Sequence, residues 1–160
     1  MRPIVYALTA GSIAIPAGAS TVTVTIPRLS VAEYHRPYVA VWLEPQGANG
    51  SGGAARTLAV WYDVKKGGQE PGTKWLSDLR AWWRKGGRSM KMPSGVSGAT
   101  RAPGQHVIPL PADLKPGAYV LSVEAARETG GRELVTVPLT VPNARGGAAG
   151  KAELGAVTIR

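Results

Sequence analysis

Few side chains in this sequence could carry catalysis. The chain of 160 residues has no cysteine and two histidines, His35 and His106. Without cysteine, disulfide scaffolds, iron–sulfur clusters, cysteine-ligated zinc and thiol catalysis are excluded. There is no Gly-x-Ser-x-Gly elbow, and the Gly-Gly pairs at 67–68 and 86–87 lack the spacing and the following Lys-Ser/Thr of a phosphate-binding loop. We therefore expect a protein that is not an enzyme.

A metal site is not predicted either. His35 has an acidic neighbour in Glu33, but no pair of candidate ligands has a recognised metal-ligand spacing. The simpler interpretation of His35 is a polar residue that leads into a strand. A metal-handling protein that uses His35 remains the weakest of three functional alternatives.

Two groups of side chains could bind a ligand. The aromatic residues of the middle of the chain either fill the core or form a platform for a flat ligand, and the core is the expected place for most of them: Trp61, Tyr62, Trp75, Trp82 and Trp83. Since adjacent helical residues point about 100° apart, one of Trp82 and Trp83 could remain open to a ligand. The basic residues nearby either form a solvated surface or hold a phosphate: Arg80, Arg84, Lys85, Arg88, Lys91 and Arg101.

The elements that must position these residues are mostly strands. Thr21 to Ile26 alternates hydroxyl and apolar side chains, which predicts a half-buried strand. Pro37 to Glu44 is apolar on both faces, as in a central strand. Further strands are expected in these ranges: Thr57–Asp63, Gln105–Leu110, Ala118–Ala126, Val135–Val141 and Leu154–Ile159. Pro138 favours an edge position for the strand that contains it. The pattern predicts an all-β fold, an antiparallel immunoglobulin-like β-sandwich.

One helix and three loops complete the prediction. Helix spacing of Trp75, Leu76, Leu79, Trp82 and Trp83 predicts one short Trp-rich helix over Thr73–Lys85. Pro45–Ala55 and Asn143–Gly150 are expected to be Gly-rich loops. Arg88–Gly104 has no periodicity and is too long for a simple turn. Loops of this length are often functional.

The N-terminus predicts export. Ile4 to Ala19 carries no charge and ends in Ala17-Gly18-Ala19 before Ser20, the small-x-small pattern of signal peptidase sites. We expect a signal peptide over 1–19 and one domain over 20–160, soluble in the periplasm and not an integral membrane protein. The net charge of +9 is spread along the chain, so we expect an anionic envelope component or cofactor as its counterpart and no nucleic acid.

Four segments in order give a family resemblance: 32–44, 57–62, 75–84 and 97–104. Together they resemble a family of predicted periplasmic bacterial proteins, domain of unknown function 2271, over nearly all of the mature chain. The segment 115–125 is similar to the closing hairpin of bacterial immunoglobulin-like modules such as those of flagellar hook-capping proteins. The second resemblance implies a sandwich, and the family resemblance brings little function with it.

A local resemblance is more informative. Ser97-Gly98-Ala99-Thr100 resembles the Ser/Thr-Gly-Ala-Thr motif on which an exported flavin transferase esterifies FMN. It implies that Thr100 carries the phosphoester and that Gly98 and Ala99 are its small neighbours. Ser94 stands where the motif usually has aspartate.

This resemblance implies a periplasmic flavin-carrying electron-transfer module, a flavoprotein whose partners are the exported flavin transferase and membrane redox proteins. The alternative is a cofactor-free immunoglobulin-like binding or assembly module of the bacterial envelope.

Overall fold

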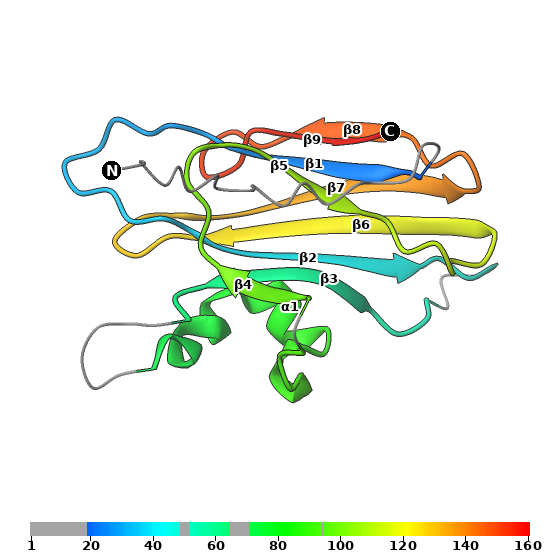
Figure 1. The fold of residues 1–160 in the computed structure, drawn as a ribbon, viewed down its shortest axis with the longest axis horizontal. Helices are drawn as coiled ribbons and strands as arrows, with labels where there is room; N and C mark the ends of the chain where they lie inside the picture. The colour runs from blue at the N-terminus through cyan, green and yellow to red at the C-terminus, as the bar shows by residue number, and fades with distance from the viewer. Residues whose placement is uncertain (1–18, 49–51, 65–70, 94) are drawn as a thin grey trace, which may run out of the picture.

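Two β-sheets stack face to face in the computed structural model, which describes residues 19–48, 52–64, 71–93 and 95–160 (Figure 1). One sheet has four strands in the order β5-β1-β9-β8, and the other has five in the order β4-β3-β2-β6-β7. The immunoglobulin-like all-β sandwich predicted from the sequence is confirmed. The predicted signal peptide lies outside the described residues, apart from Ala19.

The strands of the four-stranded sheet are β1 (Thr21–Ile26), β5 (Gly104–Pro109), β8 (Gly146–Ala149) and β9 (Ala156–Ile159). Those of the five-stranded sheet are β2 (Tyr38–Pro45), β3 (Arg56–Tyr62), β4 (Ser97–Ala99), β6 (Gly117–Ala126) and β7 (Arg132–Val141). All strand pairs are antiparallel except β3 and β4, which run parallel.

The main core fills the space between the sheets. Val22, Val24 and Ile26 of β1 point into it, as their alternation predicts, and all three are at most 2% exposed. Val39, Val41 and Leu43 face them from β2. Burial of such side chains contributes about 25 cal/mol per Å² of apolar surface removed from water.

A helical layer covers the other face of the five-stranded sheet (Figure 1). It consists of the 3₁₀ helices η2 (Gly72–Asp78) and η3 (Gly87–Ser89) and the short α-helix α1 (Arg80–Arg84). Tyr38, Ala40 and Trp42 of β2 pack against this layer, which explains why β2 is apolar on both faces. Among the described residues, no helix is both long enough and apolar enough to cross a membrane.

The Trp-rich helical segment predicted over Thr73–Lys85 is present, but it is divided into two helices. The chain forms η2, leaves helical geometry at Leu79 with φ −76° and ψ 72°, and then forms α1. Leu76, Leu79 and Trp82 are the buried residues, and their spacing of three matches a 3₁₀ turn as well as an α-helical face. Glu124 of β6 accepts hydrogen bonds from the backbone N–H groups of Ala81 (3.1 Å) and Trp82 (2.9 Å), so α1 begins where this carboxylate binds it.

Two predicted loops contain strands. Asn143–Gly150 includes β8, and Arg88–Gly104 includes η3 and β4. Glycine and alanine carry little strand propensity, and both strands form because a neighbouring strand offers unpaired backbone groups. The edge position predicted from Pro138 is confirmed, since β7 is the last strand of its sheet.

Candidate functional site

The motif Ser97-Gly98-Ala99-Thr100 lies at the edge of the five-stranded sheet. Ser97, Gly98 and Ala99 form β4, in parallel register with Val60, Trp61 and Tyr62 of β3. The Ser97 hydroxyl donates to the carbonyl of Pro93 (3.2 Å), and its backbone N–H donates to the same carbonyl (3.2 Å). These two hydrogen bonds fix the turn before β4 and leave the end of β4 to present Thr100.

Gly98 is not required by the packing of this chain. A Cβ atom at Gly98 would lie 3.7 Å from a guanidinium nitrogen of Arg101 and 3.9 Å from the ring of Trp61, which are ordinary contacts. By contrast, a Cβ at Gly72 would lie 1.8 Å from the carbonyl oxygen of Asp63, so the fold itself requires that glycine. The small residue at 98 therefore needs a reason other than folding.

Thr100 begins the segment that carries the chain from one sheet to the other. β4 belongs to the five-stranded sheet and β5 to the four-stranded sheet, and 100–103 connect them (Figure 1). The Arg101 guanidinium lies 5.4 Å from the ring centroid of Trp61. Trp61 also contacts His106 edge to face at 5.5 Å, and His106 Nε2 lies 2.7 Å from the carbonyl oxygen of Ala102. These contacts hold the crossover against the core.

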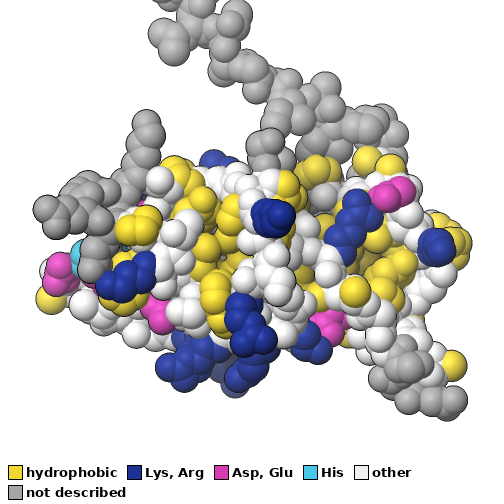
Figure 2. Space-filling view, turned by 90° about the horizontal axis from the view of Figure 1, so that it is seen from below, with side chains coloured by type: hydrophobic (Ala, Val, Ile, Leu, Met, Phe, Trp, Pro, Cys, Tyr) yellow, Lys and Arg dark blue, Asp and Glu magenta, His cyan; other side chains and the backbone are white. Residues whose placement is uncertain are grey.

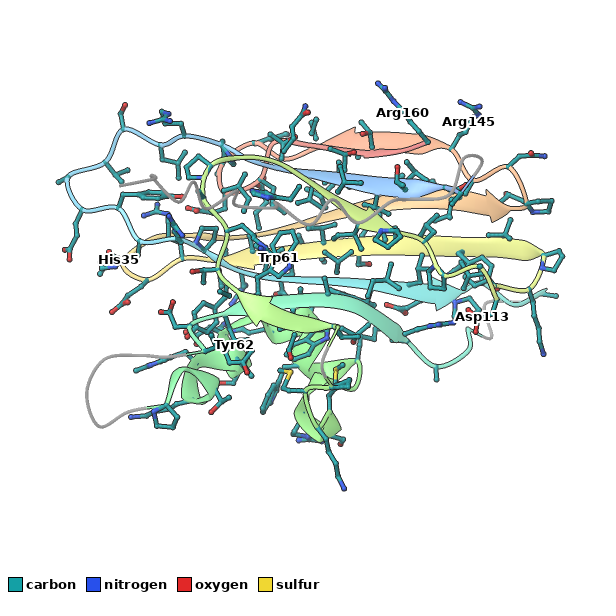
Figure 3. The ribbon with its side chains drawn as sticks, viewed as in Figure 1. His35, Trp61, Tyr62, Asp113, Arg145 and Arg160 are labelled. Carbon is teal, nitrogen blue, oxygen red and sulfur yellow. The ribbon has the colours of Figure 1, made fainter. Side chains whose placement is uncertain are left out.

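Trp61 and Tyr62 face opposite ways from β3. Trp61 is 4% exposed and belongs to the core between the sheets, whereas Tyr62 packs against the cluster under the helical layer (Figure 3). The crossover is therefore anchored on the core side of the strand. The helical layer is anchored on the other side.

The side chain of Thr100 is half-buried, and its hydroxyl has no hydrogen-bond partner within the described part of the chain. It lines a cavity of about 420 Å³, within the range of small-molecule sites, roughly 300–1,000 Å³. An ordinary buried strand threonine would be closed to chemistry. Thr100 instead lies at the wall of a cavity.

The other walls of this cavity come from four distant parts of the sequence. The aromatic lining is Tyr34, Tyr38 and Trp75, and the turn between β6 and β7 contributes Arg127, Glu128 and Thr129. His35, labelled in Figure 3, lies on the connection that leads into β2 and also lines the cavity. The remaining charged lining residues are Arg36, Asp63 and Asp78. The cavity thus combines aromatic surface with polar groups of both charges.

Two of the lining side chains are fixed by hydrogen bonds. The Tyr38 hydroxyl donates to the carbonyl of Gly72 (2.9 Å), and burial is the main reason why the pKa of Tyr38 rises from 10.0 to about 12. Tyr38 is therefore neutral at physiological pH. Arg127 donates twice to Glu153, at 2.9 and 3.1 Å, with both side chains 7% exposed or less. These contacts make the wall rigid before any ligand binds.

The hydroxyl of Tyr34 is different. It is buried, and it is the one buried side-chain polar atom without a hydrogen-bond partner in the described part of the chain. A buried hydroxyl without a partner costs about 1–3 kcal/mol relative to a paired one. Tyr34 lines the cavity, but its hydroxyl is enclosed by protein atoms, so a ligand in the cavity does not reach this oxygen.

The sequence-predicted aromatic residues divide as follows. Trp82 is 1% exposed, and Trp83 is half-buried against the cluster under the helical layer, so the pair packs on the sheet. Trp75 is 39% exposed and lines the cavity with Thr100. Sequence reasoning missed Tyr34 and Arg36, although they stand beside His35 in a segment treated as a lead into β2. It also missed 127–129, which only the fold brings to Thr100.

The basic residues do not gather around Thr100. Figure 2 shows Lys and Arg side chains grouped on the side of the helical layer. Five of the six predicted basic residues are exposed there and do not line the cavity: Arg80, Arg84, Lys85, Arg88 and Lys91. Arg101 is exposed and adjoins Thr100 in the sequence. It is the cation of that group closest along the chain to Thr100.

No cluster of three or more potential metal ligands occurs within residues 19–48, 52–64, 71–93 and 95–160. His35 Nε2 lies 2.9 Å from Glu33, and its Nδ1 lies 3.9 Å from Glu128. A second cavity of about 560 Å³, at the opposite end of the sandwich, is lined by Arg145 and Arg160 but by no aromatic residue (Figure 3). The cavity at Thr100 is the better candidate for a planar ligand.

Comparison with known proteins gives one match. A family model described as "Predicted periplasmic protein (DUF2271)" matches residues 19–156. The match covers the five-stranded sheet, the helical layer, the four-stranded sheet as far as the first residue of β9, and every residue that lines the cavity at Thr100. No curated protein and no solved structure matches the chain.

Proposed function

Because the chain belongs to DUF2271, a family of predicted periplasmic proteins, we propose that it is a flavin carrier of the periplasm. In this proposal FMN is esterified through its phosphate to Thr100, and the loaded domain passes electrons between membrane redox proteins. The flavin supplies the redox chemistry, and the protein positions it. The domain has no catalytic group of its own in this role.

The observation that carries the proposal is the position of Thr100. Thr100 directly follows a short edge strand, and its side chain carries no hydrogen bond to the described residues and lines a cavity with aromatic walls. A modifying enzyme must bring the pyrophosphate of FAD up to this hydroxyl. Gly98, which the fold does not require, and the exposed Ala99 leave that approach open.

The attachment step balances without an oxidant. The Thr100 hydroxyl oxygen attacks the phosphorus of the FMN half of FAD, and the bond from that phosphorus to the bridging oxygen breaks. AMP leaves with the bridging oxygen, and the hydroxyl proton passes to a base of the transferase. The product is FMN held through a threonine phosphoester, which carries negative charge at neutral pH.

The test is the intact mass of the protein purified from the periplasm of cells that also produce an exported flavin transferase. We expect the wild type to gain the mass of one FMN less one water, and to keep its yellow colour after denaturation. Thr100→Val should have the mass of the bare chain. The matched control is Thr129→Val, because Thr129 lines the same cavity but lies outside the motif, and it should be loaded like the wild type.

A second protein with a known attachment motif, produced in the same cells, reports that the transferase is active. If that protein is loaded and the wild-type chain is not, the flavin proposal is wrong. The cofactor-free binding or assembly module would then be the better account of the domain.

A further inference from the structure

We propose that the cavity beside Thr100 is the binding site for the isoalloxazine ring of the flavin, with Trp75 as its stacking partner. The inference rests on the proposed attachment to Thr100. It adds the place of the ring, which the motif does not determine, because a flexible ribityl chain separates the ring from the phosphate.

Trp75 is the first reason. Trp42 and Trp82 are 1% exposed, whereas Trp75 is 39% exposed and lines the cavity. The Lys74 ammonium lies 5.1 Å from the ring centroid of Trp75. An indole that lines a cavity is suited to stack on a flat aromatic ring, which adds about 0.5–1.5 kcal/mol beyond the burial of its surface.

The aromatic lining is the second reason. Tyr34 and Tyr38 line the cavity together with Trp75, and the hydroxyl of Tyr38 is already used by the carbonyl of Gly72. Aromatic surface of this kind suits a flat ring system.

The charges of the lining decide which part of FMN enters. Asp63, Asp78 and Glu128 outnumber Arg36 and Arg127, and Arg127 is already paired with Glu153. A phosphate would meet net negative charge in the cavity. The oxidised ring is neutral, and it has an N–H group that can donate a hydrogen bond to a carboxylate. The phosphate therefore stays at the rim on Thr100, next to the exposed Arg101, and the ring enters.

The geometry of the wall supports a site that exists before the flavin arrives. Tyr38 is tied to Gly72, and the turn after β6 is tied to Glu153 through Arg127 and through the backbone N–H of Gly131 (3.0 Å). Preorganised walls lower the entropy cost of ordering a ligand. A ring tethered to Thr100 also has a high effective concentration at the cavity.

The test is the flavin fluorescence of the loaded protein, measured before and after digestion with protease. An indole in contact with isoalloxazine quenches its fluorescence, so the wild type should be strongly quenched and should recover on digestion. Trp75→Leu should be several-fold brighter at the same intact mass. Trp83→Leu is the matched control, because Trp83 packs against the cluster under the helical layer and does not line the cavity. The fluorescence of this variant should be as strongly quenched as that of the wild type.

If Trp75→Leu and Trp83→Leu are equally quenched at full loading, or if only Trp83→Leu brightens, the ring lies elsewhere and the inference is wrong.

A second experiment separates failure of attachment from failure of the ring site. It uses unmodified protein and lumiflavin, which is the isolated ring system. If the wild-type mass lacks FMN, the proposed function fails, and the ring site is decided by whether the protein quenches lumiflavin through Trp75. Quenching that is lost in Trp75→Leu and kept in Trp83→Leu supports the site. No quenching by the wild type overturns it.

Discussion

Glu133 illustrates how a single carboxylate can organise a connection far from it in the sequence. Glu133 lies on β7, and its carboxylate accepts hydrogen bonds from the backbone N–H groups of Ala152 (3.1 Å) and Leu154 (2.8 Å), and also from Lys151. A carboxylate that binds several backbone donors is stabilised in its charged form. The connection between β8 and β9 is therefore held to the neighbouring sheet by charge.

The same contacts predict a pH dependence. Burial raises the pKa of Glu133, but the hydrogen bonds from 151, 152 and 154 outweigh it, so the pKa lies below its usual 4.5. A depressed folded-state pKa gives stability that is complete above the unfolded value and is lost as the pH falls through the folded value. We expect the urea midpoint of the wild type to fall below about pH 4.5.

Glu133→Gln should have a lower urea midpoint than the wild type at neutral pH and a shallower fall on acidification. The pKa values of Glu44 and Asp113 are also lowered, so part of the slope remains in the variant. Urea titrations at a series of pH values measure both slopes. Equal slopes for the variant and the wild type would contradict this role of Glu133.

At the scale of elements, α1 depends on a carboxylate from a strand. Its N-terminal flank has no side-chain cap of its own, and Glu124, which is 2% exposed, receives the N–H groups of Ala81 and Trp82 instead. The first N–H groups of a helix need acceptors, and negative charge is favourable there. One side chain of β6 thus fixes both the start of α1 and its place on the sheet.

Glu124→Gln keeps the volume but loses the charge and one acceptor. We expect it to lower the free energy of unfolding by about 1–3 kcal/mol, measured by urea titration of tryptophan fluorescence. Asp113→Asn, which removes an exposed partner of Arg56, is the control and should leave the midpoint close to that of the wild type. A fall of the same size in both variants would exclude a specific role for Glu124.

The sequence predicted the elements whose periodicity is strong. The alternation of β1 and the two apolar faces of β2 gave the correct strands and the correct burial. Sequence-based prediction missed β4 and β8, because their Ser, Gly and Ala residues have no apolar pattern. These two strands form only because the edge of a neighbouring strand is available for pairing. The break at Leu79 was missed because five apolar residues over so short a stretch fit a period of 3.0 or 3.6 equally well.

The candidate site shows the same division. Thr100 could be found from four consecutive residues, because a modification motif is local. The cavity could not, since its walls come from 34–38, from Trp75 and from 126–129, and only the sheet order places these next to β4.

At the scale of the whole molecule, a buried ion pair joins the two sheets. Arg127 follows β6 of the five-stranded sheet, and Glu153 lies between β8 and β9 of the four-stranded sheet. Removal of one member of a buried pair leaves an uncompensated charge and costs about 3–5 kcal/mol.

We therefore expect Glu153→Leu alone to lower the free energy of unfolding by about that amount, and Arg127→Met alone to do the same. The double variant, Arg127→Met with Glu153→Leu, should recover much of the loss, because an apolar pair of similar volume has no charge to solvate. A double-mutant cycle in urea measures the coupling. Strictly additive losses would contradict a direct pair.

The place of β1 within its sheet has a kinetic consequence. Val22 pairs with Ile108 on one side and with Ile159 on the other, so the earliest strand has no neighbour in its sheet until β5 is present and has both neighbours only when β9 is present. Such a topology has high contact order, because long loops must close before the contacts that stabilise them can form. We therefore expect the four-stranded sheet to be completed only after the strand at 156–159 is available, whereas β2 and β3, which pair with each other, can pair earlier.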